Sequence, residues 1–384
     1  MIDFFTASGG YILPFIFVLT IVVFFHELGH FLVARACRVK VETFSVGFGR
    51  ALISRPDRHG TEWKLGWLPL GGYVKFAGDS NAASTPDADE LAAMDDDARK
   101  DTLFYKPLWQ RSAVVAAGPV ANFILAILIF AGLYTTLGQR VIDPVIGSVI
   151  EESAAERAGL QVGDRVLEID GETIETFNEL RRAVTLNAEQ PLTFTILRGG
   201  SSFEQVIIPD RKRTTDRFGN AYDTGQLGVS VSVEGDAVRH VRYGVLDGLQ
   251  RGVEESYFIV EQTFVMLGRI ILGRENADNL GGPIRIAQLS GQTASVGLVA
   301  LINLTAVLSV SIGLINLFPI PMLDGGHLMF YAYEAVFGRP LSARAQEAAM
   351  RIGLGLVIAL FAFVTWQDLA RLDTFGALAR FFGF

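Results

Sequence analysis

Residues 11–34 read YILPFIFVLTIVVFFHELGHFLVA, and this stretch decides the fold of the chain. It is apolar and long enough to cross a bilayer, because a transmembrane helix needs about 20 apolar residues. The run nevertheless contains His26, Glu27 and His30, in the pattern H-E-x-x-H. Polar side chains are costly inside a membrane span and by default serve a function there. The stretch therefore predicts a transmembrane helix that carries a chemical site.

The spacing of the two histidines indicates a metal site. Residues i and i+4 share one face of a helix, so His26 and His30 can bind one Zn²⁺ together. The carboxylate of Glu27 lies beside them and can take a proton from metal-bound water. The alternative is a pair of interior histidines with satisfied hydrogen bonds. The cost of placing polar groups in a span makes this the weaker interpretation.

The composition agrees with a membrane protein. Half of the 384 residues are hydrophobic and 19% are charged, against about 25% in soluble domains. This excludes a disordered chain, which needs high charge and low hydrophobicity. A net charge of −8 argues against nucleic acid as a partner, because phosphate binding needs clustered Lys and Arg. The single cysteine, Cys37, excludes an intrachain disulfide and a multi-cysteine metal site.

Three further apolar runs follow the first one. With it, they predict a polytopic α-helical membrane protein that has four transmembrane helices. The predicted helices occupy 1–36, 112–137 and 348–368, and the segment 295–327 holds the third helix together with the proline-containing motif that follows it.

The basic residues predict how the chain is oriented. The loop at 35–111 contains twelve Lys and Arg residues, and Arg339, Arg344 and Arg351 lie after the third helix. The positive-inside rule places both loops in the cytosol. Both termini and the long segment 140–295 then lie on the outer side of the membrane.

A catalytic zinc has three protein ligands, and the third must lie at a similar membrane depth. Asp324 meets this condition, because it follows the third apolar run at the cytosolic end, where His30 also lies. Its surroundings read NLFPIPMLDGGH at 316–327, in which the prolines break the helix and the two glycines let the backbone turn tightly. Two alternatives stay open: Asp324 is an ordinary turn residue, or His327 is the third ligand.

The remaining segments are predicted from alternation, helical spacing and polarity. They are a cytosolic loop at 37–111 with a β-hairpin at 41–76 and a flexible acidic stretch at 79–101, an outer α+β domain at 138–212, a linker with an amphipathic helix at 213–294, a cytosolic connection at 328–347 and a tail at 369–384. The apolar face of the amphipathic helix, 245–272, lies either on the membrane or on the protein's own domain.

Taken together, these motifs resemble the site-2 protease family of intramembrane zinc metalloproteases. The bacterial regulator-of-sigma-E protease type is the most similar, and the resemblance covers nearly the whole chain. The motifs that carry it are HELGH at 26–30, VGFG at 46–49, LPLGGYVKF at 68–76, AGPVANF at 117–123, GGPI at 281–284 and NLFPIPMLDGGH at 316–327.

The resemblance implies a metal site with assigned roles. His26, His30 and Asp324 would be the ligands of one zinc ion per chain, and Glu27 would be the catalytic base.

It also implies where substrate binds. Asn316 would lie near the substrate peptide, and the hairpin at 41–76 would be a membrane-re-entrant element near the active site. Gly71, Gly72 and Tyr73 of this hairpin are the candidate substrate contacts, because an exposed strand edge can pair with an extended peptide.

The outer segment resembles a PDZ domain, and SAAERAGLQVGDRVLEIDG at 153–171 is its clearest part. The best-known members of this bacterial branch carry two tandem PDZ domains. Only one is predicted in this sequence, because residues 213–244 are too few for a second. The domain either captures a newly exposed peptide C-terminus in its groove or filters out bulky ectodomains by size; we favour the filter.

The implied function is an intramembrane zinc endopeptidase that cuts the transmembrane segment of single-span membrane proteins by regulated intramembrane proteolysis. Anti-sigma-factor-like proteins of a stress response or remnant signal peptides would be its substrates. The enzyme would be a multi-pass protein of the bacterial inner membrane, with its termini and PDZ domain in the periplasm and its active site near the cytosol. A non-catalytic PDZ-bearing membrane scaffold is the main alternative, and a metal transporter is ranked last.

Overall fold

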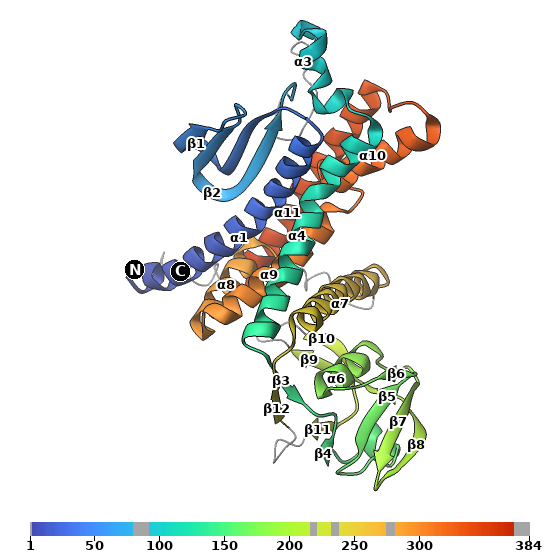
Figure 1. Ribbon diagram of the computed structural model, residues 1–384. Helices are drawn as coiled ribbons and strands as arrows, with labels where there is room; N and C mark the ends of the chain where they lie inside the picture. Colours follow the sequence, from blue (N-terminus) through green and yellow to red (C-terminus); the bar gives the residue numbers. More distant parts are fainter. Residues whose placement is uncertain (1, 80–91, 216–220, 232–237, 274–280, 372–384) are drawn as a thin grey trace. The chain divides into compact units, whose positions relative to one another are not determined.

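The computed structural model describes residues 2–79, 92–215, 221–231, 238–273 and 281–371 (Figure 1). The chain divides into two compact units. The helical unit comprises Met1–Leu133, Asp247–Leu267 and Leu280–Phe384, and the sheet unit comprises Tyr134–Leu246 and Gly268–Asn279.

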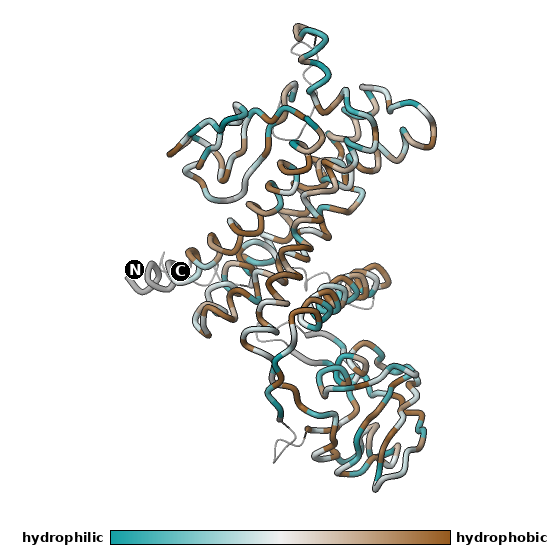
Figure 2. The backbone as a smooth tube through the Cα atoms, viewed as in Figure 1, coloured by the Kyte–Doolittle hydropathy of each residue, from teal (hydrophilic) through white to brown (hydrophobic). Residues whose placement is uncertain are grey.

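Four helices of the described residues are long and apolar enough to cross a membrane. They are α1 (Ile2–Ala36), α4 (Leu108–Thr136), α9 (Leu298–Asn316) and α11 (Ala343–Arg371). Figure 2 shows apolar residues along most of their length. In α11, large apolar side chains such as Leu356 and Phe361 are more than half exposed, at 53% and 57%. Lipid can cover such side chains in a membrane, whereas water covers them poorly.

The segment 295–327, predicted as a transmembrane helix followed by a proline motif that breaks it, is divided among three helices in the structure. α8 (Pro283–Val296) precedes α9, and Gly297 separates them with φ +139, a conformation that favours glycine. After α9 the two prolines of the motif end the helix. α10 (Asp324–Phe337) then begins, so that the segment 328–347, expected to be a connection, is largely helical.

The first hairpin packs on α1. β1 (Val41–Pro56) and β2 (Glu62–Phe76) form an antiparallel two-stranded sheet with several register shifts. Phe44 of β1 is fully buried, and its ring contacts those of Phe31 in α1 and Trp63 in β2, at centroid distances of 5.4 and 4.4 Å. Farther along the hairpin, three large apolar side chains are 61–66% exposed: Leu52, Ile53 and Trp67. One part of the hairpin is therefore core, and another part presents an apolar surface.

The acidic stretch 79–101 was expected to be flexible, and its residues 80–91 lie outside the described part. The rest contains a short helix, α3 (Asp96–Lys100), whose N-terminus is capped by the side chain of Asp95. A single 3-10 turn, η1 (Leu103–Tyr105), leads into α4. Residues 372–384 of the predicted tail also lie outside the described residues.

The sheet unit is built around a four-stranded antiparallel sheet with the strand order β6-β5-β7-β8. Its elements in chain order are β3 (Gln139–Ile142), β4 (Ile146–Val149), α5 (Ala154–Arg157), β5 (Arg165–Ile169), β6 (Glu172–Thr173), α6 (Phe177–Leu186), β7 (Leu192–Arg198), β8 (Ser201–Ile207), β9 (Asp210–Thr215), β10 (Ala221–Gln226), β11 (Val229–Val231) and β12 (Val238–Val241). Phe194 and Ile196 of β7 are fully buried and share one core cluster with Leu180 of α6. Thr176 and Glu179 form a capping box that starts α6.

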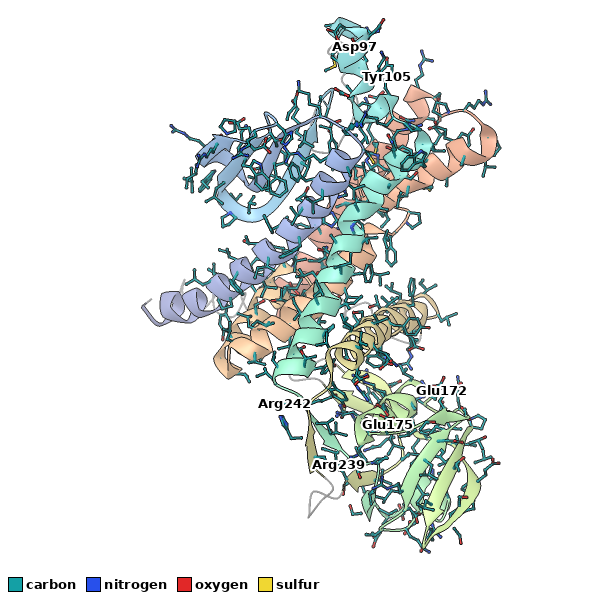
Figure 3. All side chains as sticks on the ribbon, viewed as in Figure 1. Asp97, Tyr105, Glu172, Glu175, Arg239 and Arg242 are labelled. Atoms are coloured by element: carbon teal, nitrogen blue, oxygen red, sulfur yellow. The ribbon has the colours of Figure 1, made fainter. Side chains whose placement is uncertain are left out.

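The predicted end of the outer domain at residue 212 was wrong, because it falls inside β9. β9 pairs with β10, β11 returns to pair with β4, and β12 pairs with β3. Arg239 of β12, labelled in Figure 3, also donates a hydrogen bond to Oδ1 of Asp143, at 2.6 Å. These strands are short, and their described residues are mostly half-exposed or exposed. No apolar alternation therefore marks them in the sequence, and part of the expected linker belongs to the sheet unit.

α7 (Val245–Ile271) is the expected amphipathic helix. The face of α7 that carries small residues is buried at three positions: Gly248, Gly252 and Ser256. A Cβ at Gly252 would lie 2.7 Å from the carbonyl oxygen of Ile127 in α4, so this face packs closely on that helix. Phe264, on the apolar face of this helix, is 53% exposed. α7 thus packs on the protein's own helices with one face and leaves apolar residues uncovered on another.

Candidate metal centre

His26 and His30 lie one turn apart on α1, and both are buried with 9% exposure. Their Nε2 atoms are 3.2 Å apart, and their rings are nearly perpendicular, at 83°. The helical spacing read from the sequence therefore turns both ring edges towards one point.

Asp324 brings a carboxylate to the same point from the C-terminal part of the chain. Its Oδ2 lies 3.1 Å from Nε2 of His26, and its Oδ1 lies 3.5 Å from Nε2 of His30. Ligands of a tetrahedral zinc ion, with bonds of about 2.0–2.2 Å, are separated from one another by roughly 3.3–3.5 Å. The two Nε2 atoms are 3.2 Å apart, and each lies within 3.5 Å of one of the two Asp324 oxygens, so the three side chains are close enough to share one ion.

The hydrogen bonds around the rings show what this cluster can hold. Nδ1 of His30 lies 2.8 Å from the carbonyl oxygen of Val114, which can only accept a hydrogen bond. The ring proton of neutral His30 is therefore on Nδ1, and Nε2 presents a lone pair to Asp324. Acceptors that converge in this way need a cation, and two imidazoles with one carboxylate are a donor set that suits Zn²⁺. The residues present thus fit a zinc ion.

α4 approaches α1 closely enough to touch the cluster. A Cβ at Gly118 of α4 would lie 2.2 Å from Nε2 of His30, and a Cβ at Gly29 of α1 would lie 2.2 Å from the carbonyl oxygen of Ala117. Any larger residue at these two positions would push the helices apart or displace the imidazole. The motif AGPVANF at 117–123 is therefore part of the wall behind the metal ligands.

Asp324 is the first residue of α10, and the loop before it holds it in place. Met322 has φ +86, in the left-handed region that residues with side chains rarely adopt. A Cβ at Gly325 would lie 2.2 Å from the carbonyl oxygen of Phe318, and one at Gly326 would lie 2.5 Å from the same loop. The expectation that these glycines form a tight turn was wrong, since both are helical. Their small size instead lets the loop backbone lie against the first turn of α10.

An ion pair also fixes α10 to α4. The guanidinium of Arg111 donates two hydrogen bonds to the carboxylate of Glu334, at 3.0 and 2.5 Å. Both side chains are mostly buried, with 16% and 19% exposure. A bidentate pair fixes orientation as well as distance. The helix that begins with Asp324 is thus tied to the helix that contacts His30.

A cavity of about 170 Å³ opens beside the cluster, and Glu27 is on its wall. It is lined by the following residues: His26, Glu27, His30, Val74, Phe76, Val114, Val115, Asn316, Met322, Leu323, Asp324 and His327. The backbone of Val74 in β2 hydrogen-bonds to Glu27. A Cβ at Gly72 would lie 3.4 Å from Cγ of Glu27, so β2 runs directly beside this carboxylate.

The four predicted substrate contacts differ in their positions. Asn316 lines the cavity, and Gly72 lies beside Glu27 without lining it. Gly71, with φ +141, faces the ring of Phe48, which a Cβ would approach to 2.4 Å. Tyr73 stacks on the same ring, at a centroid distance of 6.1 Å. Gly71 and Tyr73 therefore shape the hairpin, and the β2 side chains that reach the cavity are those of Val74 and Phe76.

Three groups that shape the metal centre were not predicted from the sequence. The carbonyl of Val114 carries no side-chain signature, and the backbone strain at Met322 cannot be read from residue type. Asn122 lies 3.3 Å from Nδ1 of His26 and is fully buried. As the polar residue of a charge-free run, it could have been selected. Among the described residues, His327 reaches the cavity but is not part of the group of three potential metal ligands.

These features indicate a class of enzyme. A zinc-type donor set beside a carboxylate, on a helix apolar enough to cross a membrane, is typical of a membrane-embedded zinc peptidase. Residues 14–360 match peptidase family M50. The chain belongs to this family, the site-2 proteases, and is a zinc metalloprotease with several membrane-spanning helices.

Two relatives that align with nearly the full length of this chain are also named metalloproteases. A protein of Agrobacterium fabrum named "Putative zinc metalloprotease" is 50% identical over 363 residues, which cover 94% of this chain and 96% of that protein. "Metalloprotease MmpA" of Caulobacter vibrioides is 39% identical over 389 residues, which cover 96% and 97% of the two chains. The solved PDZ domain of the SdrC-like protein from Listeria monocytogenes is 19% identical, with a TM-score of 0.19, and covers 23% of this chain and 85% of that domain. Family membership favours the enzyme over the scaffold and the transporter.

Proposed function

We propose that this metalloprotease cuts the transmembrane segment of single-span membrane proteins, inside the bilayer. The observation that carries the proposal is the depth of the cluster. His26, Glu27 and His30 all lie within the candidate span Gly10–Ala36, and the cavity opens beside them. With Gly10–Ala36 across the bilayer, as we propose, a peptide bond would reach these groups from within the membrane or from its cytosolic boundary.

In this proposal His26, His30 and Asp324 hold one zinc ion. When bound, the ion acts as a Lewis acid that polarises the scissile carbonyl and lowers the pKa of a water molecule to about 7. Glu27, on the cavity wall, takes a proton from the attacking water and delivers it to the leaving amine nitrogen. The backbone of Val74 hydrogen-bonds to the Glu27 carboxylate and keeps it beside the cavity.

Substrate binding is assigned to β2 and Asn316. An extended peptide could pair with the edge of the two-stranded sheet, which lies next to Glu27 at Gly72. Such pairing would hold the substrate unwound, and attack requires this because a helical segment hides its amide groups. Asn316, which also lines the cavity, would donate a hydrogen bond to the substrate backbone or to the developing oxyanion.

The biological setting is part of the same proposal. The enzyme would lie in the bacterial inner membrane, with both termini and the sheet unit in the periplasm and the hairpin on the cytosolic side. The sheet unit would be a PDZ domain that excludes bulky ectodomains or captures a new C-terminus. Shortened anti-sigma factors of a stress response or remnant signal peptides would then be the substrates of regulated intramembrane proteolysis.

The test is cleavage of a single-span model substrate by the purified full-length protein in lipid vesicles. Glu27→Gln removes the proton acceptor and keeps the size of the side chain. It should lower the rate at least a thousandfold, at the strong end of what a general base contributes, while the zinc content stays at the parent level.

Glu347→Gln is the matched control, because Glu347 lies on α11 and its side chain is 62% exposed. This variant should cleave at the parent rate. A Glu27→Gln protein that cleaves as fast as the parent would disprove the base assignment. Cleavage confined to the soluble part of the model substrate would disprove the intramembrane site.

A further inference from the structure

Asn122 is a buried polar residue beside His26 that the proposed reaction does not use. It lies on α4 inside a candidate span, with 0% exposure. Its Nδ2 is 3.3 Å from Nδ1 of His26, and its Oδ1 has no hydrogen-bond partner. A buried acceptor without a donor is costly and calls for an explanation.

The ring of His26 explains why this acceptor is tolerated. Its Nε2 faces Asp324 and His30, at 3.1 and 3.2 Å. If Nε2 presents a lone pair there, the proton of the neutral ring is on Nδ1 and needs an acceptor. An amide NH₂ group cannot accept it. Rotating the amide of Asn122 by 180° exchanges two atoms of nearly equal size. It places Oδ1 against the Nδ1–H group, where this oxygen gains the donor that it otherwise lacks.

The backbone around Asn122 is fixed as well. The hydroxyl of Ser309 in α9, itself fully buried, donates a hydrogen bond to the carbonyl oxygen of Asn122 at 2.8 Å. A Cβ at Gly313 would lie 3.2 Å from Cβ of Asn122. The side chain is thus held between α1 and α9, with little freedom to turn away from His26.

We propose that Asn122 is a positioning residue for the metal centre. Its Oδ1 accepts the hydrogen bond from Nδ1–H of His26, and this fixes the tautomer and the ring orientation of that ligand. The carbonyl oxygen of Val114 does the same for His30, at 2.8 Å. α4 therefore supplies both outer acceptors of the two histidines, one from a backbone group and one from a side chain. The inference rests on the proposed assignment of His26 as a zinc ligand.

The test compares zinc affinities, measured on the purified full-length protein by competition with a chelator. Removing the outer partner of a metal-bound histidine typically costs 10–100-fold in metal affinity. Asn122→Leu keeps the size and removes the acceptor, and it should weaken zinc binding by that factor. Asn122→Asp keeps an acceptor oxygen and should stay within about threefold of the parent. Asn303→Leu is the matched control, an exposed asparagine on α9, and should leave the affinity unchanged.

Two results would overturn the inference: parent affinity in Asn122→Leu, or a loss in Asn122→Asp as large as in Asn122→Leu. The first result would mean that Asn122 only fills space, and the second would mean that its acceptor oxygen is not what supports zinc binding. If Asn122→Leu does not fold, Asn122→Ala removes the same acceptor without adding bulk, and the same loss is expected. His26→Ala separates the two proposals. Zinc lost in His26→Ala but kept in Asn122→Leu rejects only the role of Asn122, whereas zinc kept in His26→Ala rejects the metal assignment itself.

Discussion

A methyl group at Gly118 would lie 2.2 Å from Nε2 of His30, closer than real side-chain contacts allow. The nearest atoms belong to an imidazole whose Nδ1 is bound to the carbonyl of Val114, so the ring has little room to retreat. Gly118→Ala should therefore displace a ligand without changing any donor atom. We expect at least a tenfold weaker affinity for zinc, which is about 1.4 kcal/mol.

The control for this substitution is on the same helix. A Cβ at Gly132 of α4 would meet no atom within 4 Å. Both changes make the helix slightly more favourable, so only the clash at position 118 distinguishes them. Chelator competition on the two variants gives the comparison, and equal zinc affinity in both would contradict the close approach of α4 to His30.

Asp164 in the sheet unit predicts a dependence of stability on pH. Its carboxylate is buried and accepts hydrogen bonds from Arg198 at 2.7 Å and from the backbone N–H of Gln161 at 2.8 Å. Burial by itself would raise the pKa of Asp164, but these hydrogen bonds outweigh it and lower the pKa from its ordinary value of 3.8. Because the folded pKa is the lower one, the stabilisation is present at neutral pH and is lost as the pH falls below about 4.

Arg198→Met tests this dependence. At pH 6 it should cost the sheet unit about 2 kcal/mol, the range for a hydrogen bond to a buried charge. The difference from the parent should shrink on acidification, because a protonated Asp164 no longer needs its cation. Hydrogen exchange of the amides in β5 and β7, corrected for intrinsic rates, measures it. A difference that is the same at pH 6 and pH 2.5 would show that the pair contributes nothing through ionisation.

For individual residues, the sequence predicts which side chains form the metal site better than it predicts which groups contact them. His26, Glu27 and His30 are adjacent in one motif. The need for a third donor at the same depth made Asp324 a candidate beside His327, and the family resemblance selected Asp324. The structure brings the donor atoms of His26, His30 and Asp324 within 4.8 Å of one another. The carbonyl of Val114 and the amide of Asn122 come from α4, 84 and 96 positions away in the chain. No local pattern encodes such contacts, because they exist only once the helices pack.

Among the elements, α8 depends on a side chain from the far end of the chain. Asp368 of α11 is 5% exposed and caps the N-terminus of α8. Its carboxylate accepts hydrogen bonds from the backbone N–H groups of Gly282, Ile284 and Arg285, at 3.1–3.2 Å. A Cβ at Gly282 would lie 2.5 Å from the same carboxylate, which explains why glycine occupies this position.

Asp368→Ala should therefore destabilise the helical unit. It leaves several backbone donors of α8 without a partner, and loss of a cap costs up to about 2 kcal/mol. We expect a lower melting temperature in detergent and an unchanged zinc content, since Asp368 is not part of the group of potential metal ligands. Glu347→Ala, an exposed i,i+4 partner of Arg351 on the same helix, should change the melting temperature little. Equal melting temperatures for the two variants would contradict the cap.

Elements with strong periodicity were easier to predict than elements without it. The four apolar runs, the helix at 177–186 and the strands β7 and β8 stand out in the sequence by length or alternation. α10 does not stand out in the sequence, because its first turn follows two prolines and contains two glycines, and these residues usually end helices. The strands β10, β11 and β12 do not stand out either, because short strands with half-exposed residues lack an apolar stripe. The end of the outer domain was misplaced for this reason.

For the whole molecule, the proposed topology of four membrane spans has both termini on the periplasmic side. The proposed orientation is tested with single cysteines in a Cys37→Ser background. Glu172→Cys on β6 lies in the sheet unit, and Asp97→Cys on α3 lies in the first loop (Figure 3). Both positions are exposed. An impermeant maleimide should label Glu172→Cys in cells with an opened outer membrane and Asp97→Cys only after lysis. The reverse pattern would invert the topology.

The central claim is that two segments far apart in the sequence form one zinc site. Elemental analysis of zinc per chain, on protein purified without chelators, tests it most directly. Asp324→Ala should lose most of the metal. His327→Ala, one turn further along α10 and on the same cavity, should keep about one zinc per chain, as the parent does. Full zinc in Asp324→Ala, or its loss in His327→Ala alone, would contradict the account.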